Sequence, residues 1–367
     1  MVGLDEVKRR LRVFAADQAA GISPLYEHLA ERAASDDDVA GLLTAAPDAQ
    51  AQPALLLATA HRLVQADPIH PLSRYYPSLG GFDGVDDATW PTFREFLLER
   101  AGKARAYIEV RHTNTNEVSR AACLFPAVAA ALKAAGGKAA LLEIGCSAGL
   151  LLGLDKYGYR YQCDGGEQLA AGPAKTPVGL HCALERGEGA VLPKLPKKIT
   201  VGAKVGLDSE PVDVSDEDEL AWLEACVWAD QLERIKLLRA AAAAQRKDRP
   251  ELIAGDAVDD LVAAADRTGD LPLIVLTSRV VGHLGDRGGA FVAELAKLAA
   301  ARPVWWVSDE PYEAALALVL PGRDELNCFD GPGLCTLGLV HWQDGVPDAE
   351  ALALTSRFGQ RMTWLAT

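Results

Sequence analysis

The stretch L-L-E-I-G-C-S-A-G-L, Leu141–Leu150, decides the fold of this 367-residue chain. Its first residues are typical of a strand, the small residues from Gly145 to Gly149 predict a tight turn, and the apolar run after Leu150 predicts a helix that runs to about Asp155. A strand that feeds a helix through such a turn presents backbone N–H groups at a helix N-terminus, where a polar or anionic ligand binds well. The sequence therefore predicts a ligand site at this turn.

The chain on either side of the turn differs in character. Residues 1–137 have apolar positions at helical spacing and no convincing strand, so we predict a helical N-terminal domain that caps the site and selects the substrate. From 138 to 367, apolar strands such as Leu271–Ser278 and Pro303–Glu310 alternate with helices, which predicts an α/β domain with a doubly wound, mostly parallel sheet. We expect seven strands, with an insertion at about 158–205 that contains a hairpin.

Bulk composition narrows the class of protein. The formal charge of −14 argues against a nucleic-acid partner, which requires a basic surface. Seven cysteines without a C-x-x-C pair indicate a reduced protein without a metal site. The chain shows no signal peptide, and its longest nearly apolar run, Ala121–Ala135, is too short to span a bilayer. We expect a cytoplasmic protein that binds a small molecule and neither nucleic acid nor membrane.

Two chemistries compete for the turn. As E-x-G-x-S-x-G it resembles the first motif of class I S-adenosylmethionine (SAM) dependent methyltransferases, and as G-x-S-x-G it matches the nucleophile elbow of α/β-hydrolases, with Ser147 as nucleophile. A hydrolase elbow follows several strands, whereas Leu141–Ile144 is the first strand here. A dinucleotide fingerprint would need glycines where Ser147 and Leu150 stand, which disfavours NAD. We therefore favour a Rossmann-like methyltransferase fold and retain a serine hydrolase as an alternative.

The resemblance to methyltransferases implies roles for the residues of the turn and for acids after later strands. Glu143 would hold the amino-acid end of SAM, and small residues would let the backbone approach the cofactor. These small residues are Gly145, Cys146, Ser147 and Gly149. A second acid should accept both ribose hydroxyls, and three candidates remain open: Asp208, Asp164 and Asp230. Asp256 would accept from the adenine amino group, Ala257 would pack on the ring, and Thr277 would face the cofactor.

A polar segment, Arg111–Arg120, crowds a helix start just before the first strand. Helix capping explains two of its polar residues but not all of them. Glu117 and Arg120 are three residues apart and share one helix face, which we expect to line the ligand pocket with Asn116. A methyl acceptor with an O–H or N–H group needs a base, and the candidates by residue type are Glu117, His112, Asp230 and Glu310.

Several motifs together resemble the bacterial family catalogued as domain of unknown function 2332. They are T-N-T-N-E-V-x-R, L-L-E-I-G-C-S-A-G-L, V-G-L-D-x-x-P-V-D-V, W-L-x-A-x-x-W-x-D-Q-x-x-R and G-D-A-V-D-D-L. The likeness extends over nearly the whole chain and implies a methyltransferase-like core without naming a substrate. Gln231 and Arg234, in the fourth motif, are candidate substrate-binding residues. Ala229 stands where proline is expected, so we predict a straight helix through this motif.

The leading hypothesis is a SAM-dependent methyltransferase that acts on a small molecule. No Asn-Pro-Pro-Tyr motif follows the strand that ends at Ser278, which disfavours amino-methylation of bases or glutamine. The alternative from another class is a non-catalytic protein of methyltransferase fold that binds SAM or another nucleoside.

Overall fold

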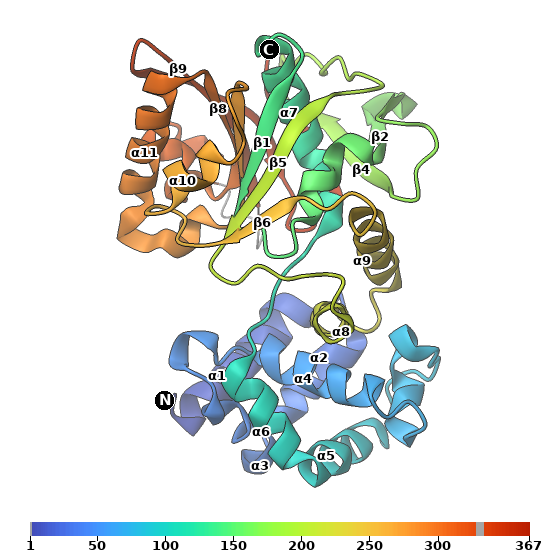
Figure 1. The fold of residues 1–367 in the computed structure, drawn as a ribbon. Coiled ribbons are helices and arrows are strands. Elements are labelled where there is room, and N and C mark those ends of the chain that lie inside the picture. Colours follow the sequence, from blue (N-terminus) through green and yellow to red (C-terminus); the bar gives the residue numbers. More distant parts are fainter. Residues whose placement is uncertain (1, 328–333) are drawn as a thin grey trace. The chain divides into compact units, whose positions relative to one another are not determined.

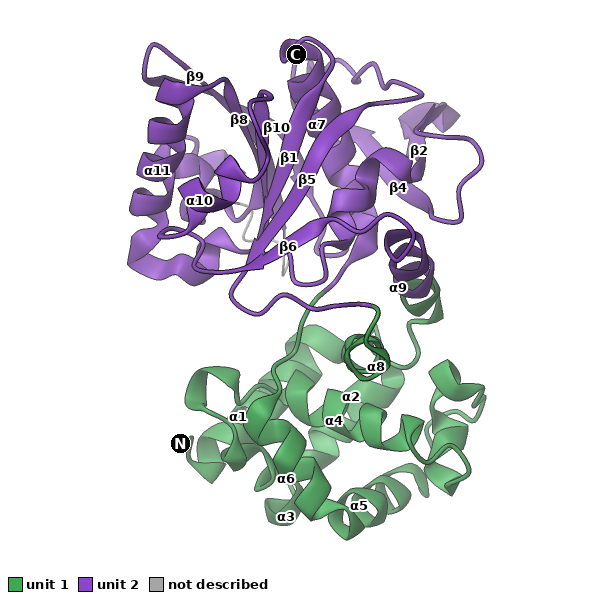
Figure 2. Cartoon of the chain, viewed as in Figure 1, with its two compact units in different colours: residues 1–115, 215–236 green, residues 116–214, 237–367 purple. Residues whose placement is uncertain are grey.

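The computed structural model describes residues 2–327 and 334–367 and divides into two compact units (Figure 2). Unit 1 comprises residues 1–115 and 215–236, and unit 2 comprises residues 116–214 and 237–367. The division differs from the expected boundary at residue 137, because the helix that precedes the first strand is grouped with the sheet.

Unit 1 is built from helices, as predicted for the N-terminal third of the chain (Figure 1). The helices are α1 (Leu4–Val13), α2 (Pro24–Ala33), α3 (Asp37–Ala40), α4 (Pro53–Gln65), α5 (Thr89–Glu99), α6 (Ala101–Val110) and α8 (Glu217–Cys226), and a π-helical turn (Phe14–Ala19) follows α1. Ser23 caps α2, since its hydroxyl accepts from the N–H of Tyr26 at 3.1 Å and Pro24 takes the first helical position.

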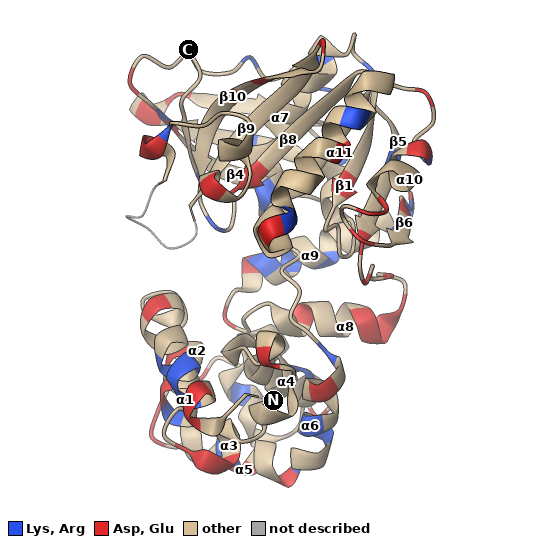
Figure 3. Cartoon of the chain, turned by 90° about the vertical axis from the view of Figure 1, so that its left-hand side faces the viewer, with Lys and Arg blue, Asp and Glu red and all other residues tan. Residues whose placement is uncertain are grey.

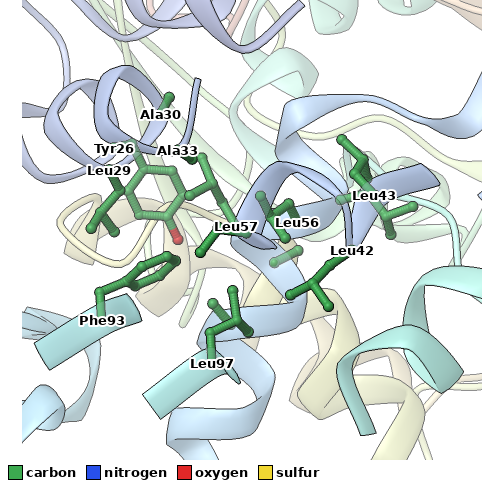
Figure 4. Packing of buried hydrophobic residues seen from close by; sticks show 14 of the residues in the cluster. Tyr26, Leu29, Ala30, Ala33, Leu42, Leu43, Leu56, Leu57, Phe93 and Leu97 are labelled. Carbon is green, nitrogen blue, oxygen red and sulfur yellow. The ribbon is translucent and has the colours of Figure 1, made fainter. Parts of the chain in front are cut away.

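The core of unit 1 is a continuous apolar cluster. Tyr26 of α2, Leu57 of α4 and Phe93 and Leu97 of α5 are all buried and lie close to one another (Figure 4). Because each helix contributes one apolar face, the unit buries its own core without the sheet.

The segment from Asp216 to Asp248 forms two helices, α8 and α9 (Leu232–Gln245), with a break at 227–231. The first turn of α8 is acidic, and Figure 3 shows these acids in red. The expectation of a straight helix through Ala229 was wrong. The backbone of Ala229 bonds instead to the hydroxyl of Tyr26 and to the N–H of Ser78, so tertiary hydrogen bonds replace the helical ones at the break.

Unit 2 contains an 11-stranded sheet in the order β3-β2-β4-β11-β10-β9-β8-β7-β1-β5-β6 within the described residues. The strands are β1 (Ala139–Ile144), β2 (Gly158–Cys163), β3 (Gln168–Ala171), β4 (Gly179–Arg186), β5 (Val201–Asp208), β6 (Glu251–Ala254), β7 (Leu273–Ser278), β8 (Val304–Glu310), β9 (Cys335–Gln343), β10 (Val346–Thr355) and β11 (Arg361–Trp364). Strands β6, β5, β1, β7 and β8 are consecutive and parallel.

The order of these five strands reverses at β1. The chain passes from β1 outward to β5 and β6, and then returns to the opposite side of β1 for β7 and β8. In an open parallel sheet, the loops after two adjacent strands can run in opposite directions, and a crevice then forms between them at the carboxyl ends of the strands, where ligands bind. The segment Leu141–Leu150, which contains the end of β1 and the turn after it, lies at this reversal.

Helices cover both faces of this sheet. Ala140, Leu142 and Ile144 of β1 pack in one cluster with residues of α10 (Leu261–Asp266) and α11 (Gly288–Ala301). Because successive side chains of a strand point to opposite faces, Glu143 faces the other side. The helix α7 (Ala121–Ala134) is almost entirely buried and contacts β4, β7, β8 and β9.

The sheet is wider than the expected seven strands because the insertion at 158–205 extends it. The predicted hairpin between the segments around β2 and β4 was wrong, since these strands are parallel and the hairpin is formed by β2 and β3. Strand β4 pairs with β11, which attaches the insertion to the far end of the sheet.

Three local features complete the description of unit 2. Strand β10 lies between β9 and β11, and its alanine-rich sequence gives little strand signal. Two short 3₁₀ turns, Tyr312–Ala314 and Leu316–Leu318, follow β8. The segment after the central turn is a 3₁₀ segment, η7 (Leu150–Lys156), so the expected α-helix N-terminus is not formed there. No helix among the described residues is both long and apolar enough to cross a membrane.

Candidate functional site

The turn after β1 is held in a conformation that requires small residues. Gly145, Ser147 and Gly149 all have positive φ, at 68°, 46° and 65°. A Cβ at Gly145 would lie 2.5 Å from the side chain of Val280, which follows β7. A Cβ at Gly149 would lie 2.8 Å from Leu252 of β6. The glycines therefore serve both backbone geometry and close packing against Val280 and Leu252. Their predicted role in letting the backbone approach a cofactor stays a prediction.

Asp208 and Asn116 fix this turn. The N–H of Ser147 donates to Oδ2 of Asp208 at 2.8 Å, and Oδ1 of Asp208 accepts from the N–H of Glu210 at 2.9 Å. Asn116 donates to the Ser147 hydroxyl at 3.1 Å and accepts from the N–H of Ala148 at 3.2 Å. The structure thus brings the predicted residues Asn116, Ser147 and Asp208 together.

The other two candidate ribose acids lie elsewhere. Asp164 follows β2 and accepts from the N–H of Arg186 at 2.8 Å. Six strands separate β2 from β1 in the described sheet, so Asp164 is far from the turn. Asp230 belongs to unit 1, where its carboxylate accepts from the hydroxyl of Ser23 at 2.5 Å and burial raises its pKa.

Glu143 is a buried acid next to the turn. Its side chain is 4% exposed, and its Oε2 has no hydrogen-bond partner among the described residues. Burial raises the pKa of Glu143 well above its usual range, and the nearby Asp208 adds to this rise. The N–H of Leu152 and the charge of Arg120 act in the opposite direction. A buried acceptor without a partner is costly, so this atom is suited to a donor supplied by a ligand.

Arg120 and Glu117 are buried just before α7. Their expected role in lining a ligand pocket stays a prediction. Glu117 accepts from the N–H of Ser119 at 3.3 Å, so it also acts as a cap. Arg120 is 6% exposed, and its Nε donates to the carbonyl of Arg357 at 3.2 Å. Burial and the charge of Arg279 lower the pKa of Arg120, while Asp309 and Glu117 oppose this.

Two acids end β8 beside this charged group. Asp309 accepts from the hydroxyls of Ser278 and Thr355, and Oε1 of Glu310 accepts from the N–H of Val280 at 2.9 Å. Oε2 of Glu310 has no hydrogen-bond partner among the described residues. Burial raises the pKa of Glu310 to about 7, although backbone N–H groups, first that of Val280, oppose the rise.

Sequence reasoning missed part of this group. Glu310 was a candidate by residue type alone, and Asp309, Arg279 and Thr355 were not considered. Asp309 and Glu310 end a strand that is buried along its whole length. Because acids are seldom buried without a partner, two acids at the end of an apolar run could have been recognised as candidate site residues. Arg279 has a positive φ of 61°, which the sequence does not indicate.

The residues expected to bind adenine are engaged within the protein. Both oxygens of Asp256 accept from Arg287, each at 2.8 Å, and Oδ1 also accepts from two backbone N–H groups. This contact holds the pKa of Asp256 well below its usual range. Ala257 is half-buried beside it, and the hydroxyl of Thr277 accepts from the indole of Trp306 at 3.0 Å.

Cys146 turns toward the sheet. It is buried, and a Cβ at Gly206 of β5 would lie 2.5 Å from its sulfur. Burial raises the pKa of its thiol above the usual range, so Cys146 packs as a small apolar side chain.

The remaining predicted residues belong to unit 1. The carbonyl of His112 accepts from the indole of Trp222 at 3.0 Å. Gln231 donates to the carbonyl of Ile22 at 3.2 Å, and Arg234 lies at the start of α9. These contacts are internal to unit 1, so His112, Asp230, Gln231 and Arg234 are not among the residues that unit 2 gathers around the turn.

No group of three or more metal-binding side chains occurs in the part of the chain that the structure describes. The charged cluster in unit 2 instead brings the carboxyl groups of Asp309 and Glu117 and the guanidinium of Arg279 within electrostatic range of Arg120. Such perturbed, buried ionisable groups at strand ends are typical of functional sites.

Comparison with known proteins places the chain in a family. No curated protein and no solved structure matches it. The profile of one bacterial family, described as "Uncharacterized protein conserved in bacteria (DUF2332)", matches residues 8–364, which is nearly the whole chain. The chain therefore belongs to the bacterial family DUF2332.

Proposed function

We propose that unit 2 binds SAM at the turn after β1 and that the protein is a SAM-dependent methyltransferase acting on a small molecule. The observation that carries the proposal is Glu143. Its buried Oε2 lacks a hydrogen-bond partner among the described residues, and Glu143 directly precedes a turn in which three residues have positive φ. SAM carries an ammonium and a sulfonium group, and a buried carboxylate favours a cation.

The five parallel strands support the same proposal. In chain order they are arranged third, second, first, fourth, fifth, as in doubly wound nucleotide-binding sheets. The acid that ends the second of them, Asp208, reaches the turn after the first. Its oxygens retain lone pairs beyond their two backbone bonds, so Asp208 can accept the ribose hydroxyls.

In this proposal, different residues around the turn bind different groups of the cofactor. Glu143 would accept from the α-ammonium group of the cofactor, and the guanidinium of Arg120, which interacts electrostatically with Glu143, would hold the carboxylate group of the cofactor. The backbone at Gly145 and Ser147 would lie against the cofactor. A cofactor with a methyl group on a sulfonium supplies the electrophile when it is bound.

Catalysis then consists of positioning the acceptor and removing its proton. Holding the acceptor atom in line with the methyl group supplies most of the acceleration. Oε2 of Glu310 takes the proton of an acceptor O–H or N–H, because a carboxyl group with a pKa of about 7 can both accept and release a proton near neutral pH.

Isothermal titration with SAM tests the proposal. The wild type should bind, and Gly145→Arg should not, because its side chain would fill the turn against Val280. Circular dichroism establishes that the variant is folded. Absence of binding by the wild type, or unchanged binding by folded Gly145→Arg, would refute the proposal.

A nucleoside-binding protein without methyl transfer is the second candidate. The burial of Glu310, which is 1% exposed, favours it, because a base must reach its substrate. Incubation with methyl-labelled SAM and a bacterial metabolite extract separates the two. If the protein is a transferase, the labelled methyl group appears in a small molecule from the extract. If the protein only binds the nucleoside, the label stays in SAM.

The serine hydrolase hypothesis gains one observation, the positive φ of Ser147, since a strained turn is also typical of a nucleophile elbow. However, the Ser147 hydroxyl accepts from Asn116. A serine hydrolase also needs a histidine base, and His341, which follows Ser147 in the chain, stacks on Trp305 with ring centroids 4.6 Å apart. A fluorophosphonate probe labels Ser147 only if the hydrolase hypothesis is right.

A further inference from the structure

The backbone of Arg279, which directly follows β7, is held in the left-handed region. Its φ is 61°, and apart from glycines the only other described residues with positive φ are Asp344, in the turn between β9 and β10, and Ser147, in the central turn. A Cβ is disfavoured in this conformation, and residues that tolerate such strain cluster at functional sites. An arginine at this position therefore needs an explanation beyond the turn itself.

The left-handed turn decides which face of the sheet Arg279 reaches. Val275 of β7 packs in the apolar cluster that includes residues of α10 and α11. Because side chains alternate along a strand, a regular continuation of β7 would direct Arg279, four residues later, toward the same cluster. Instead, the charge of Arg279 acts on Arg120, just before α7, and on Cys123 of α7. The guanidinium thus lies on the face of the sheet that also holds Glu143.

Two guanidinium groups of the same charge lie near each other at this place. Burial first and then the charge of Arg279 lower the pKa of Arg120, and the opposing effects of Asp309 and Glu117 are each smaller. Both oxygens of Asp309 already accept from side-chain hydroxyls. Because little water screens the two arginines from each other, an anion that binds beside them would reduce their repulsion.

Solvent reaches Arg279 more readily than Arg120. Arg279 is half-buried, whereas Arg120 is 6% exposed. The Nε of Arg279 is buried, so its Nη groups are the donors suited to a ligand. Arg279 also follows β7, which neighbours β1 on one side of the point where the strand order reverses. The crevice at such a reversal is where open parallel sheets bind their ligands.

The surroundings of Arg279 select the kind of anion. A guanidinium can present two parallel N–H groups to a carboxylate or a phosphate. Two acids lie close by, since the N–H of Arg279 donates to the carbonyl of Asp309 and the N–H of the next residue, Val280, donates to the carboxyl group of Glu310. A phosphate monoester carries about −1.5 to −2 charges at neutral pH, so these acids repel it more strongly than a carboxylate with its single charge. The site therefore favours a carboxylate.

We propose that Arg279 binds the carboxylate group of the small molecule that accepts the methyl group. The substrate is accordingly a small carboxylic acid, and Arg279 is a specificity-determining residue for it. The identity of this acid as the methyl acceptor rests on the proposed function, whereas carboxylate binding at Arg279 does not.

Acetate and acetamide test the carboxylate site directly, because they have nearly the same shape and only acetate carries a charge. Binding is followed by the side-chain N–H resonances of the arginines in the full-length protein at constant ionic strength, with Arg279 assigned from Arg279→Lys. Acetate should shift the Arg279 resonance saturably, and acetamide should not. Arg287 is the internal control, since Asp256 already occupies its guanidinium. Failure of acetate to give a saturable shift, or an equal shift with acetamide, would overturn the proposal.

Methyl-labelled SAM and a bacterial metabolite extract test the identity of the substrate. Treating the extract with a carbodiimide and excess methylamine, which converts carboxylates to amides, should prevent labelling of a small molecule. For the acceptor found in the untreated extract, Arg279→Gln should raise the KM at least about tenfold and leave the affinity for SAM unchanged. Arg267→Gln is the matched control and should behave as the wild type, because Arg267 forms an exposed ion pair with Glu251.

The carboxylate assignment and the proposed function fail in different ways. Labelling that persists after treatment of the extract, or an unchanged KM in folded Arg279→Gln, would refute the carboxylate assignment and leave the transferase. A saturable acetate shift in a protein that does not bind SAM would refute the proposed function and leave carboxylate binding at Arg279.

Discussion

The carboxylate of Asp208, at the end of β5, accepts a hydrogen bond from the backbone N–H of Ser147, in the turn after β1, at 2.8 Å. This contact joins the ends of two adjacent parallel strands and orients the turn in which we place the ligand. An acid that already touches the turn can bind a ligand there without a rearrangement of the backbone.

Asp208→Asn tests the role of this acid. The affinity for SAM should fall about 10–100-fold, because hydrogen bonds to a charged acceptor contribute roughly 1.5–3 kcal/mol. Isothermal titration measures the change. Asp164→Asn is the matched control, since Asp164 directly follows a strand and also accepts a backbone N–H at 2.8 Å. An equal loss in both variants would contradict a specific role for Asp208.

Gly145→Ala tests the packing of the turn. The variant should be destabilised by roughly 2–5 kcal/mol, since positive φ disfavours a Cβ and Val280 leaves no room for it. Urea denaturation measures the free energy of unfolding. Gly269→Ala is the control, because Gly269 has a φ of 70° with open space around it and should lose only the backbone contribution. Adding Val280→Ala to Gly145→Ala should recover part of the stability.

Glu310 should make stability depend on pH. Its folded-state pKa of about 7 lies above the ordinary value of 4.5, so the folded protein holds this proton more tightly than the unfolded chain. The stabilisation is therefore complete below about pH 4.5 and is lost as the pH rises through 7, by about 3 kcal/mol in total.

Denaturation series for the wild type and Glu310→Gln between pH 5 and 8 measure this effect. Glutamine does not titrate, so the difference between the two proteins isolates Glu310 from Glu143, whose pKa is also raised. Parallel pH profiles for the two proteins would show that Glu310 is ionised throughout.

Arg287→Ala tests the state of Asp256. Removing the guanidinium should return the pKa of Asp256 toward its ordinary range and change stability little, since this ion pair is exposed. If Asp256 accepts from adenine, the affinity for SAM should rise, because Arg287 no longer competes for the carboxylate. Titration of SAM into Arg287→Ala and Asp256→Asn should give changes of opposite sign.

The sequence by itself determined the local parts of this protein. The apolar runs of β7 and β8, the N-cap at Ser23 and the glycines of the central turn follow from patterns within a few residues, because strand burial, helix capping and positive φ depend on near neighbours. The match of residues 8–364 to the family profile agrees with the motifs read from the chain.

Only the tertiary structure decided which of these parts meet. Asp164 follows a strand, Asp208 ends one, and both accept a backbone N–H. Only Asp208 reaches the turn, because the sheet order places β5 beside β1 and puts six strands between β2 and β1. The contact of Thr355 with Asp309 spans 46 residues of sequence. Strand order and the burial of charged groups depend on packing across the whole unit, and the propensities of neighbouring residues do not indicate this packing.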